Sequence, residues 1–140
     1  MNSYKFVDIH LGLEESFSVR VKSEKLDKFR EISGDINPLH TDTEYSKSRG
    51  FSDRVVHGML TSIFFSTLVG VYLPGKYCIL QGIDIQFSKP VYIDDVLTIT
   101  GKVSYINEAY RQIEVKAVIV NQDDEKVSKA TIKVGVIDEQ

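Results

Sequence analysis

Residues 55–73 read VVHGMLTSIFFSTLVGVYL, a run of 19 residues without Asp, Glu, Lys or Arg. A run of this length could cross a membrane as a helix. His57 and four Ser or Thr side chains within it are unfavourable in lipid, and the neighbouring segments have the alternating pattern of strands. The run therefore predicts a helix over residues 55–72, stopped by Pro74 and buried on all sides within a globular fold, with no membrane association.

After this helix the sequence alternates between apolar and polar residues, a pattern typical of half-buried strands. The alternation predicts strands within residues 83–88, 97–104, 113–119 and 132–136. Polar connections at residues 107–108 and 122–125 have the length of hairpin turns. The pattern predicts four strands in an antiparallel meander, and a similar alternation over residues 16–22 provides a possible fifth strand.

These elements predict an α+β fold. We expect a single domain over residues 1–140, with a long central helix wrapped by an antiparallel sheet of about five strands. One such sheet cannot cover a helix that is apolar on most sides, and the edge strands of the sheet also need protection. Both features predict a homodimer.

Two shorter helices are predicted before the central helix. Ser23 can cap the first, over residues 24–33, whose apolar residues recur every third position up to Ile32 and form one narrow face. Asp42 or Thr43 can cap the second.

Segment 33–40 reads SGDINPLH and combines turn-forming residues with two groups that can exchange protons. Gly34 ends the preceding helix, and Asn37 is pushed toward extended geometry by the proline that follows it. His40 is therefore predicted in a turn or loop, five residues after Asp35. The carboxylate and the imidazole can converge on one small molecule such as water. Alternatively, Asp35 only accepts backbone N–H bonds within the turn, and His40 is an ordinary polar loop residue.

The start of the central helix is a candidate site for binding a carbonyl oxygen. Gly58 falls in the first turn, where amide N–H groups lack partners within the helix and the helix dipole adds positive partial charge. The Gly58 amide could stabilise an enolate. Gly58, Ser62, Ser66 and Gly70 form a small-residue face, which serves either close packing or as a floor for a thin substrate. His57 is expected to orient the loop by a hydrogen bond.

Composition excludes several classes of function. The net charge of −3 argues against a nucleic-acid-binding protein. Three histidines without compact spacing and a single cysteine do not match a zinc site, so no metal is expected. Cys78 is expected to be a small buried apolar residue. Residues 1–13 lack the continuous apolar core of a secretory signal, which predicts a cytoplasmic location.

Three motifs together resemble one known family. They are GDINPLH at residues 34–40, VHGML at residues 56–60, and FSKPV at residues 87–91 followed by Asp95. The chain resembles the MaoC-like or (R)-specific enoyl-CoA hydratases over nearly its whole length. The resemblance implies a hot dog fold, a homodimer and no metal or redox cofactor. It also implies a trans-2-enoyl thioester substrate of fatty acid metabolism, carried by coenzyme A or by acyl carrier protein.

The resemblance also implies roles for individual residues. Asp35 and His40 would hold and activate one water, which adds across the double bond to give an (R)-3-hydroxyacyl product, or is removed in the reverse dehydration. The Gly58 amide would bind the thioester oxygen. Asn37 would shape the loop, and Ser66 matches a family position that helps order the site.

The sequence departs from the family pattern at Asp94, where a glycine is usual; aspartate tolerates a left-handed turn. Two alternative functions share the fold. A thioesterase would need a carboxylate on the central helix, which residues 55–73 lack. A non-catalytic acyl-thioester binding module would need neither Asp35 nor His40. Lys76 and Lys89 are possible phosphate contacts or simply solvated surface lysines.

Overall fold

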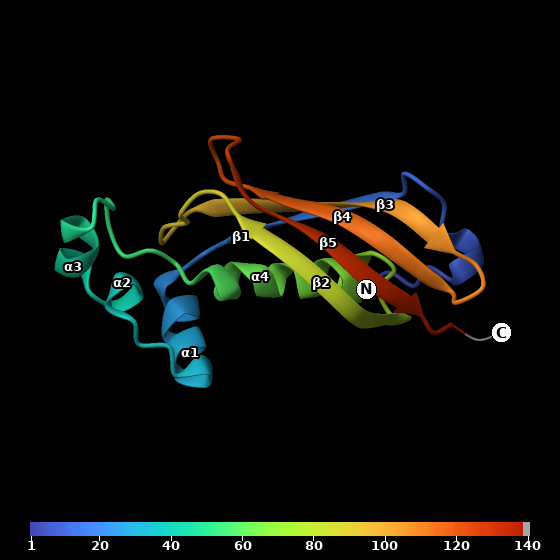
Figure 1. The fold of residues 1–140 in the computed structure, drawn as a ribbon, viewed down its shortest axis with the longest axis horizontal. Helices are drawn as coiled ribbons and strands as arrows, with labels where there is room; N and C mark the ends of the chain where they lie inside the picture. Colours follow the sequence, from blue (N-terminus) through green and yellow to red (C-terminus); the bar gives the residue numbers. More distant parts are fainter. Residues whose placement is uncertain (139–140) are drawn as a thin grey trace.

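The computed structural model describes residues 1–138 and contains one curved antiparallel sheet that wraps a central helix (Figure 1). The strands are β1 (Glu14–Arg20), β2 (Cys78–Phe87), β3 (Val96–Asn107), β4 (Gln112–Val120) and β5 (Lys126–Val136). The helices are α1 (Ser23–Ser33), α2 (Pro38–Thr41), α3 (Thr43–Ser48) and α4 (Gly58–Thr67), with short turns η1 (Phe6–Asp8) and η2 (Leu68–Tyr72). The predicted α+β architecture, with five strands around the helix, is confirmed.

The strand order is β1-β3-β4-β5-β2, so the predicted four-strand meander is wrong in one respect. Strands β3, β4 and β5 are joined by short hairpins, but β2 pairs with β5 and not with β3. The connection over residues 88–95 is held away from the sheet edge, because Val91 O accepts from Val56 N–H and Asp95 O accepts from Val21 N–H. This connection crosses the end of the sheet and returns the chain beside β1.

The α4 helix begins three residues later than predicted. Val55 and Val56 are extended instead, because Val55 bridges Tyr92 and the Val56 amide bonds to Val91 O at 2.8 Å. The helix then continues through the π-helical turn η2, so the helical part ends at Tyr72 as predicted. The buried side of α4 is mostly apolar, with Phe65 and the following Leu68 completely buried, and it also contains Thr61 and Ser62.

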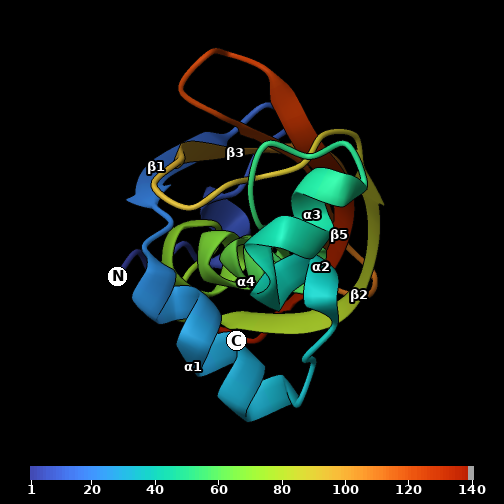
Figure 2. The same cartoon turned by 90° about the vertical axis from the view of Figure 1, so that its left-hand side faces the viewer.

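Helices α1, α2 and α3 gather at the end of the molecule where α4 begins (Figures 1 and 2). The predicted cap Ser23 is instead the first helical residue of α1, and Lys22 occupies the N-cap position without a side-chain capping bond. Gly34 ends α1 in the left-handed conformation, as predicted. Ile32 does not share the buried face of that helix, because it is 86% exposed.

Residues 38–41 form the short helix α2, so His40 lies on a single helical turn and not in a loop. Asp42 caps α3 through a bond from Tyr45 N–H, as predicted. No helix in the described part of the chain has both the length and the apolar character that a bilayer crossing requires.

Candidate active site

The three sequence motifs meet at the N-terminal end of α4, where backbone hydrogen bonds join them. Val55 is the central link: its N–H donates to Leu39 O at 3.0 Å, and its carbonyl accepts from His40 Nδ1 at 2.7 Å. His57 Nε2 donates to Asp35 O at 3.1 Å. These bonds hold the loop that carries Asp35 against the start of α4, although the two segments are 22 residues apart.

Asp35, His40 and His57 form a compact cluster. One nitrogen or carboxylate oxygen from each residue lies within 4.8 Å of the other two. The imidazole rings of His40 and His57 stack with centroids 3.9 Å apart and planes 26° apart. The phenyl ring of Phe29, from α1, also packs against His57, with ring centroids 4.8 Å apart and planes 57° apart. Asp35 and His40 therefore lie close together, as the resemblance implied.

Local hydrogen bonds determine which ring nitrogen of His40 and of His57 carries the proton, and they also involve the Asp35 carboxylate. His40 Nδ1 carries the proton that it donates to Val55 O, which leaves Nε2 as the free nitrogen. His57 Nε2 carries the proton that it donates to Asp35 O, which leaves Nδ1 free. Asp35 Oδ1 accepts from Asn37 N–H at 3.2 Å. The turn-forming role of Asp35, predicted as an alternative, is thus present together with its placement beside His40.

His57 is the most buried member of the cluster, with 2% of its surface exposed. Burial lowers the pKa of the His57 imidazole, and the nearby His40 ring lowers it further, although the bond to Asp35 O acts in the opposite direction. His57 is therefore neutral near pH 7. The expectation that His57 orients the loop by a hydrogen bond is consistent with its bond to Asp35 O.

A cavity of about 520 Å³ opens beside the cluster. Gly58 lines this cavity, and none of the hydrogen bonds among residues 1–138 uses its amide N–H as donor. The remaining lining side chains are mostly apolar and come from α4, β2, β5 and two connecting segments: Phe51, Met59, Phe87, Pro90, Val91 and Val127. The cavity therefore combines acid–base groups and a free amide donor with an apolar wall suited to an acyl chain.

The other residues predicted for the site lie in different places. Asn37 caps α2 by accepting from Leu39 N–H at 2.9 Å, so it shapes the loop without facing the cavity. Ser66 lies two turns beyond Gly58 on the exposed side of α4 and does not line the cavity. Ser62 is buried and donates to Gly58 O at 2.9 Å. Of the four small residues, Gly58 lines the cavity and Ser62 fits the packing interpretation, whereas Ser66 is exposed and a side chain at Gly70 would meet nothing within 4 Å.

His40 and His57 meet in the structure, although their spacing in the sequence did not predict it. The cluster therefore has to be compared with the geometry of a metal site. An imidazole binds a metal along its lone pair, in the plane of the ring, at about 2.0 Å. The nearly parallel planes of His40 and His57 do not direct two lone pairs to one point at that distance. The arrangement fits a small hydrogen-bonding molecule better than a metal ion.

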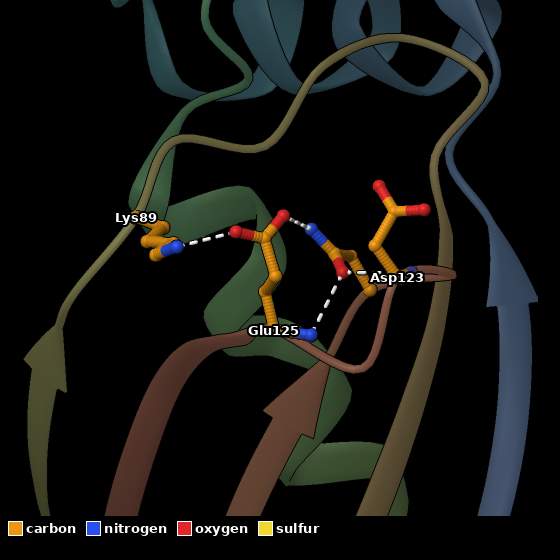
Figure 3. Close-up of polar contacts among 4 residues, drawn as sticks. Lys89, Asp123 and Glu125 are labelled. Atoms are coloured by element: carbon orange, nitrogen blue, oxygen red, sulfur yellow. Dashed lines mark hydrogen bonds and ion pairs between the residues drawn. The ribbon is translucent and has the colours of Figure 1, made fainter.

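Lys89, from the connection after β2, lies at the rim of the cavity, and Lys76 lies beyond the opposite end of α4. Figure 3 shows that Lys89 forms an ion pair with Glu125, which also accepts from the Asn121 amide. Lys89 and Asn121 together lower the pKa of the Glu125 carboxyl. Only Lys89 is placed where it could contact a bound substrate.

Sequence reasoning missed Phe87 as a wall of the site, although the residue begins the third motif. A methyl group added to Gly58 would lie 2.9 Å from Phe87 Cε1, so the ring covers the Gly58 backbone closely. Asp94, the departure from the usual glycine, has a φ of 72° and adopts the expected left-handed turn.

Comparison with known proteins shows that the chain is similar to several enzymes. The chain is 34% identical to the (R)-specific enoyl-CoA hydratase of Aeromonas caviae over 100 residues, which cover 71% of this chain and 75% of that enzyme. The crystal structure of the (R)-hydratase from A. caviae superposes with a TM-score of 0.87 at 29% identity, covering 91% of this chain and 97% of that one.

A mitochondrial 3-hydroxyacyl-[acyl-carrier-protein] dehydratase of Arabidopsis thaliana is 41% identical over 73 residues, 52% of this chain and 43% of that protein. Residues 8–126 match the model of the MaoC like domain family, a span that contains all three motifs and every residue of the cluster. The chain that brings Asp35, His40 and the Gly58 amide to one cavity therefore belongs to the MaoC-like family.

Proposed function

We propose that this protein is a hydro-lyase that adds water to trans-2-enoyl-CoA to give (R)-3-hydroxyacyl-CoA, or catalyses the reverse dehydration. The observation that carries this proposal is the convergence of Asp35, His40 and the free Gly58 amide on one largely apolar cavity. The similarity to (R)-specific enoyl-CoA hydratases supports the substrate class.

The proposed reaction follows from the position of each group. A water held between the Asp35 carboxylate and His40 Nε2 loses one proton to this pair as its oxygen bonds to the β-carbon. Negative charge then develops on the thioester oxygen, where the Gly58 N–H donates a hydrogen bond. The proton returns from the pair to the α-carbon, so water is added across the double bond and both groups regain their initial state.

The Gly58 amide contributes where charge develops. It lies at the N-terminus of α4, so the helix dipole strengthens its interaction with an enolate oxygen. One preorganised donor of this kind is worth roughly 3 to 4 kcal/mol of transition-state stabilisation. A positioned acid or base adds on the order of 10²- to 10⁴-fold in rate.

The two alternative functions have less support. A thioesterase that uses a carboxylate on the central helix has no such group here, because α4 contains neither Asp nor Glu. A binding module does not require an imidazole that is stacked and hydrogen-bonded so that one nitrogen stays free.

Incubation with crotonyl-CoA tests the proposed reaction. Loss of the enoyl absorbance without release of free thiol, together with formation of (R)-3-hydroxybutyryl-CoA, is the expected result. Thiol release would indicate a thioesterase, and no change in either signal would indicate a binding module. The same substrate on acyl carrier protein shows whether the carrier matters.

We also infer that the protein acts as a homodimer. An apolar strip, which we call the α4–β2 strip, is exposed on α4 and the neighbouring edge strand β2. It consists of Met59, Ile63, Leu80, Ile83 and Phe87, whose exposed fractions are between 41% and 60%. An exposed strand edge beside apolar side chains favours association with a second copy. Ser66 lies on the same side of α4 as Ile63, so a partner on this strip would cover it.

A further inference from the structure

The cluster at the cavity contains hydrogen-bond acceptors without a matching donor. Asp35 offers a carboxylate oxygen, and His40 and His57 each offer the ring nitrogen that is not bonded to a backbone carbonyl. Of these, His57 Nδ1 is fully buried and has no hydrogen-bond partner among the described residues. A buried acceptor without a hydrogen bond raises the free energy of the folded protein. We therefore expect the site to bind a small molecule that donates hydrogen bonds.

Water fits as the bound molecule, because it donates two hydrogen bonds. In the hydration proposed above, one O–H bond of the water breaks and the other survives as the hydroxyl of the product. The broken O–H faces the Asp35 and His40 pair. The surviving O–H needs an acceptor that does not take its proton, since the hydroxyl stays intact through the reaction.

We propose that His57 Nδ1 accepts the hydrogen bond of the surviving O–H, and so aims the lone pair of the reacting water at the β-carbon. This inference rests on the proposed hydratase function and extends it by a third side chain that contacts the reacting water. In the dehydration direction, the same nitrogen binds the 3-hydroxyl group of the substrate.

The environment of His57 suits this role. The ring cannot turn freely, because it is bonded to Asp35 O, stacked on His40 and packed against Phe29. Burial keeps it neutral, and the charged or titratable groups around it are Asp35, His40 and Arg30. A neutral imidazole with a fixed Nε2–H is an acceptor at Nδ1, and its lowered pKa makes it a weaker base than an ordinary imidazole.

Two substitutions of His57 separate the role of Nδ1 as an acceptor from the hydrogen bond that Nε2 donates to Asp35 O. The side-chain amide of His57→Asn takes the place of Nδ1, so it keeps an acceptor toward the water and loses the donor to Asp35 O. The longer His57→Gln places its amide near Nε2, so it keeps the donor to Asp35 O and loses the acceptor. We measure kcat and KM for crotonyl-CoA in both variants, after circular dichroism and thermal melting show that they fold.

We expect kcat of His57→Gln to fall by about 10-fold or more with little change in KM, and His57→Asn to retain more of the wild-type kcat. We also expect wild type, but not His57→Gln, to bind (R)-3-hydroxybutyryl-CoA more tightly than butyryl-CoA. Equal losses in the two variants, a larger loss in His57→Asn, or wild-type kcat in His57→Gln would overturn the inference.

Different kinetic results would reject this inference and the proposed function. If wild type hydrates crotonyl-CoA and His57→Gln does so at the same rate, only the role of Nδ1 is rejected. If wild type does not hydrate any enoyl-CoA, both are rejected. If neither variant folds, His57→Phe, which retains the stacked ring, takes the place of His57→Gln, with the same loss of kcat expected.

Discussion

At the scale of single residues, Asp35 and His40 can each be altered without losing the bonds that hold them. In Asp35→Asn the amide oxygen can still accept from Asn37 N–H, and in His40→Asn the amide can still donate to Val55 O in place of Nδ1. Each variant should fold normally and lose about 10²-fold or more in kcat, because the acid–base group is gone. Steady-state kinetics with crotonyl-CoA measures the loss, and turnover near wild type would remove that residue from the proposed mechanism.

Gly58 provides a second test at this scale. In Gly58→Ala the nearest neighbour of the methyl group would be the half-exposed Phe87 ring, which can move, so stability should change by less than about 1 kcal/mol. The methyl group would nevertheless displace the substrate carbonyl from the amide, and kcat/KM should fall by about 10²-fold.

The double variant Gly58→Ala, Phe87→Leu identifies the cause of that loss. If the methyl group obstructs the carbonyl, a smaller side chain at position 87 will not restore activity. Recovery in the double variant would instead mean that movement of the Phe87 ring caused the loss.

The depressed pKa of His57 makes the folded protein sensitive to acid. Unfolded histidine has a pKa of about 6.5, so the unfolded chain binds this proton before the folded chain does. Stability from neutral His57 is complete above about pH 6.5 and declines as pH falls below it, until the folded-state pKa is reached. Urea midpoints of wild type should therefore fall more between pH 7.5 and 5.5 than those of His57→Gln. Equal declines would contradict the burial of a neutral ring.

The position of a site residue could be predicted from the sequence only where a motif carries it. Asp35, His40 and Gly58, which line one cavity, were identifiable because their types and turn context already indicate acid–base chemistry and a free amide. The part played by His57 depends on a tertiary bond to Asp35 O and on stacking against His40, and neither leaves a periodic signal in the sequence.

At the scale of elements, two connections near the cavity carry a pair of oppositely charged side chains. Lys89 follows β2, and its partner Glu125 precedes β5 on the hairpin from β4 (Figure 3). A phosphate group of the carrier would have to compete with Glu125 for Lys89. Glu125→Gln should therefore lower KM for crotonyl-CoA by about 2- to 5-fold and Lys89→Gln should raise it by a similar factor, since exposed ion pairs are weak.

Crotonyl-pantetheine, which lacks phosphate, and Lys76→Gln are the controls for this prediction. Neither Lys89→Gln nor Glu125→Gln should change KM for crotonyl-pantetheine, and Lys76→Gln should leave KM for both substrates unchanged. Equal effects on the two thioesters would show that Lys89 acts on the cavity shape and not on phosphate.

The lengths of elements were predictable where local signals set them, as at Gly34 and at the end of η2. The start of α4 was not, because an apolar stretch cannot show that Val55 and Val56 bond to other segments instead of forming a helical turn. The position of β2 beside β5 was missed for a related reason. A strand pattern gives the period of side chains, whereas the partner of each strand depends on where its connection is held.

At the scale of the whole molecule, the curved sheet lies along one side of α4 (Figure 1). The α4–β2 strip is left exposed. Because Met59 and Phe87 belong to both the strip and the cavity wall, a partner on the strip would also close one side of the active site. Assembly and activity should therefore depend on the same residues.

Sedimentation of charged variants tests this dependence. Wild type should sediment at twice the chain mass of 15.9 kDa, and Ile63→Glu or Ile83→Lys should shift it toward 15.9 kDa with loss of hydratase activity. Val7→Glu is the matched control, because Val7 is 83% exposed and lies outside the strip; it should remain dimeric and active. A charge buried at an interface without a partner costs several kcal/mol, which is enough to separate the copies. A monomeric wild type, or a dimer unaffected by both charges, would show that the strip is not the contact surface.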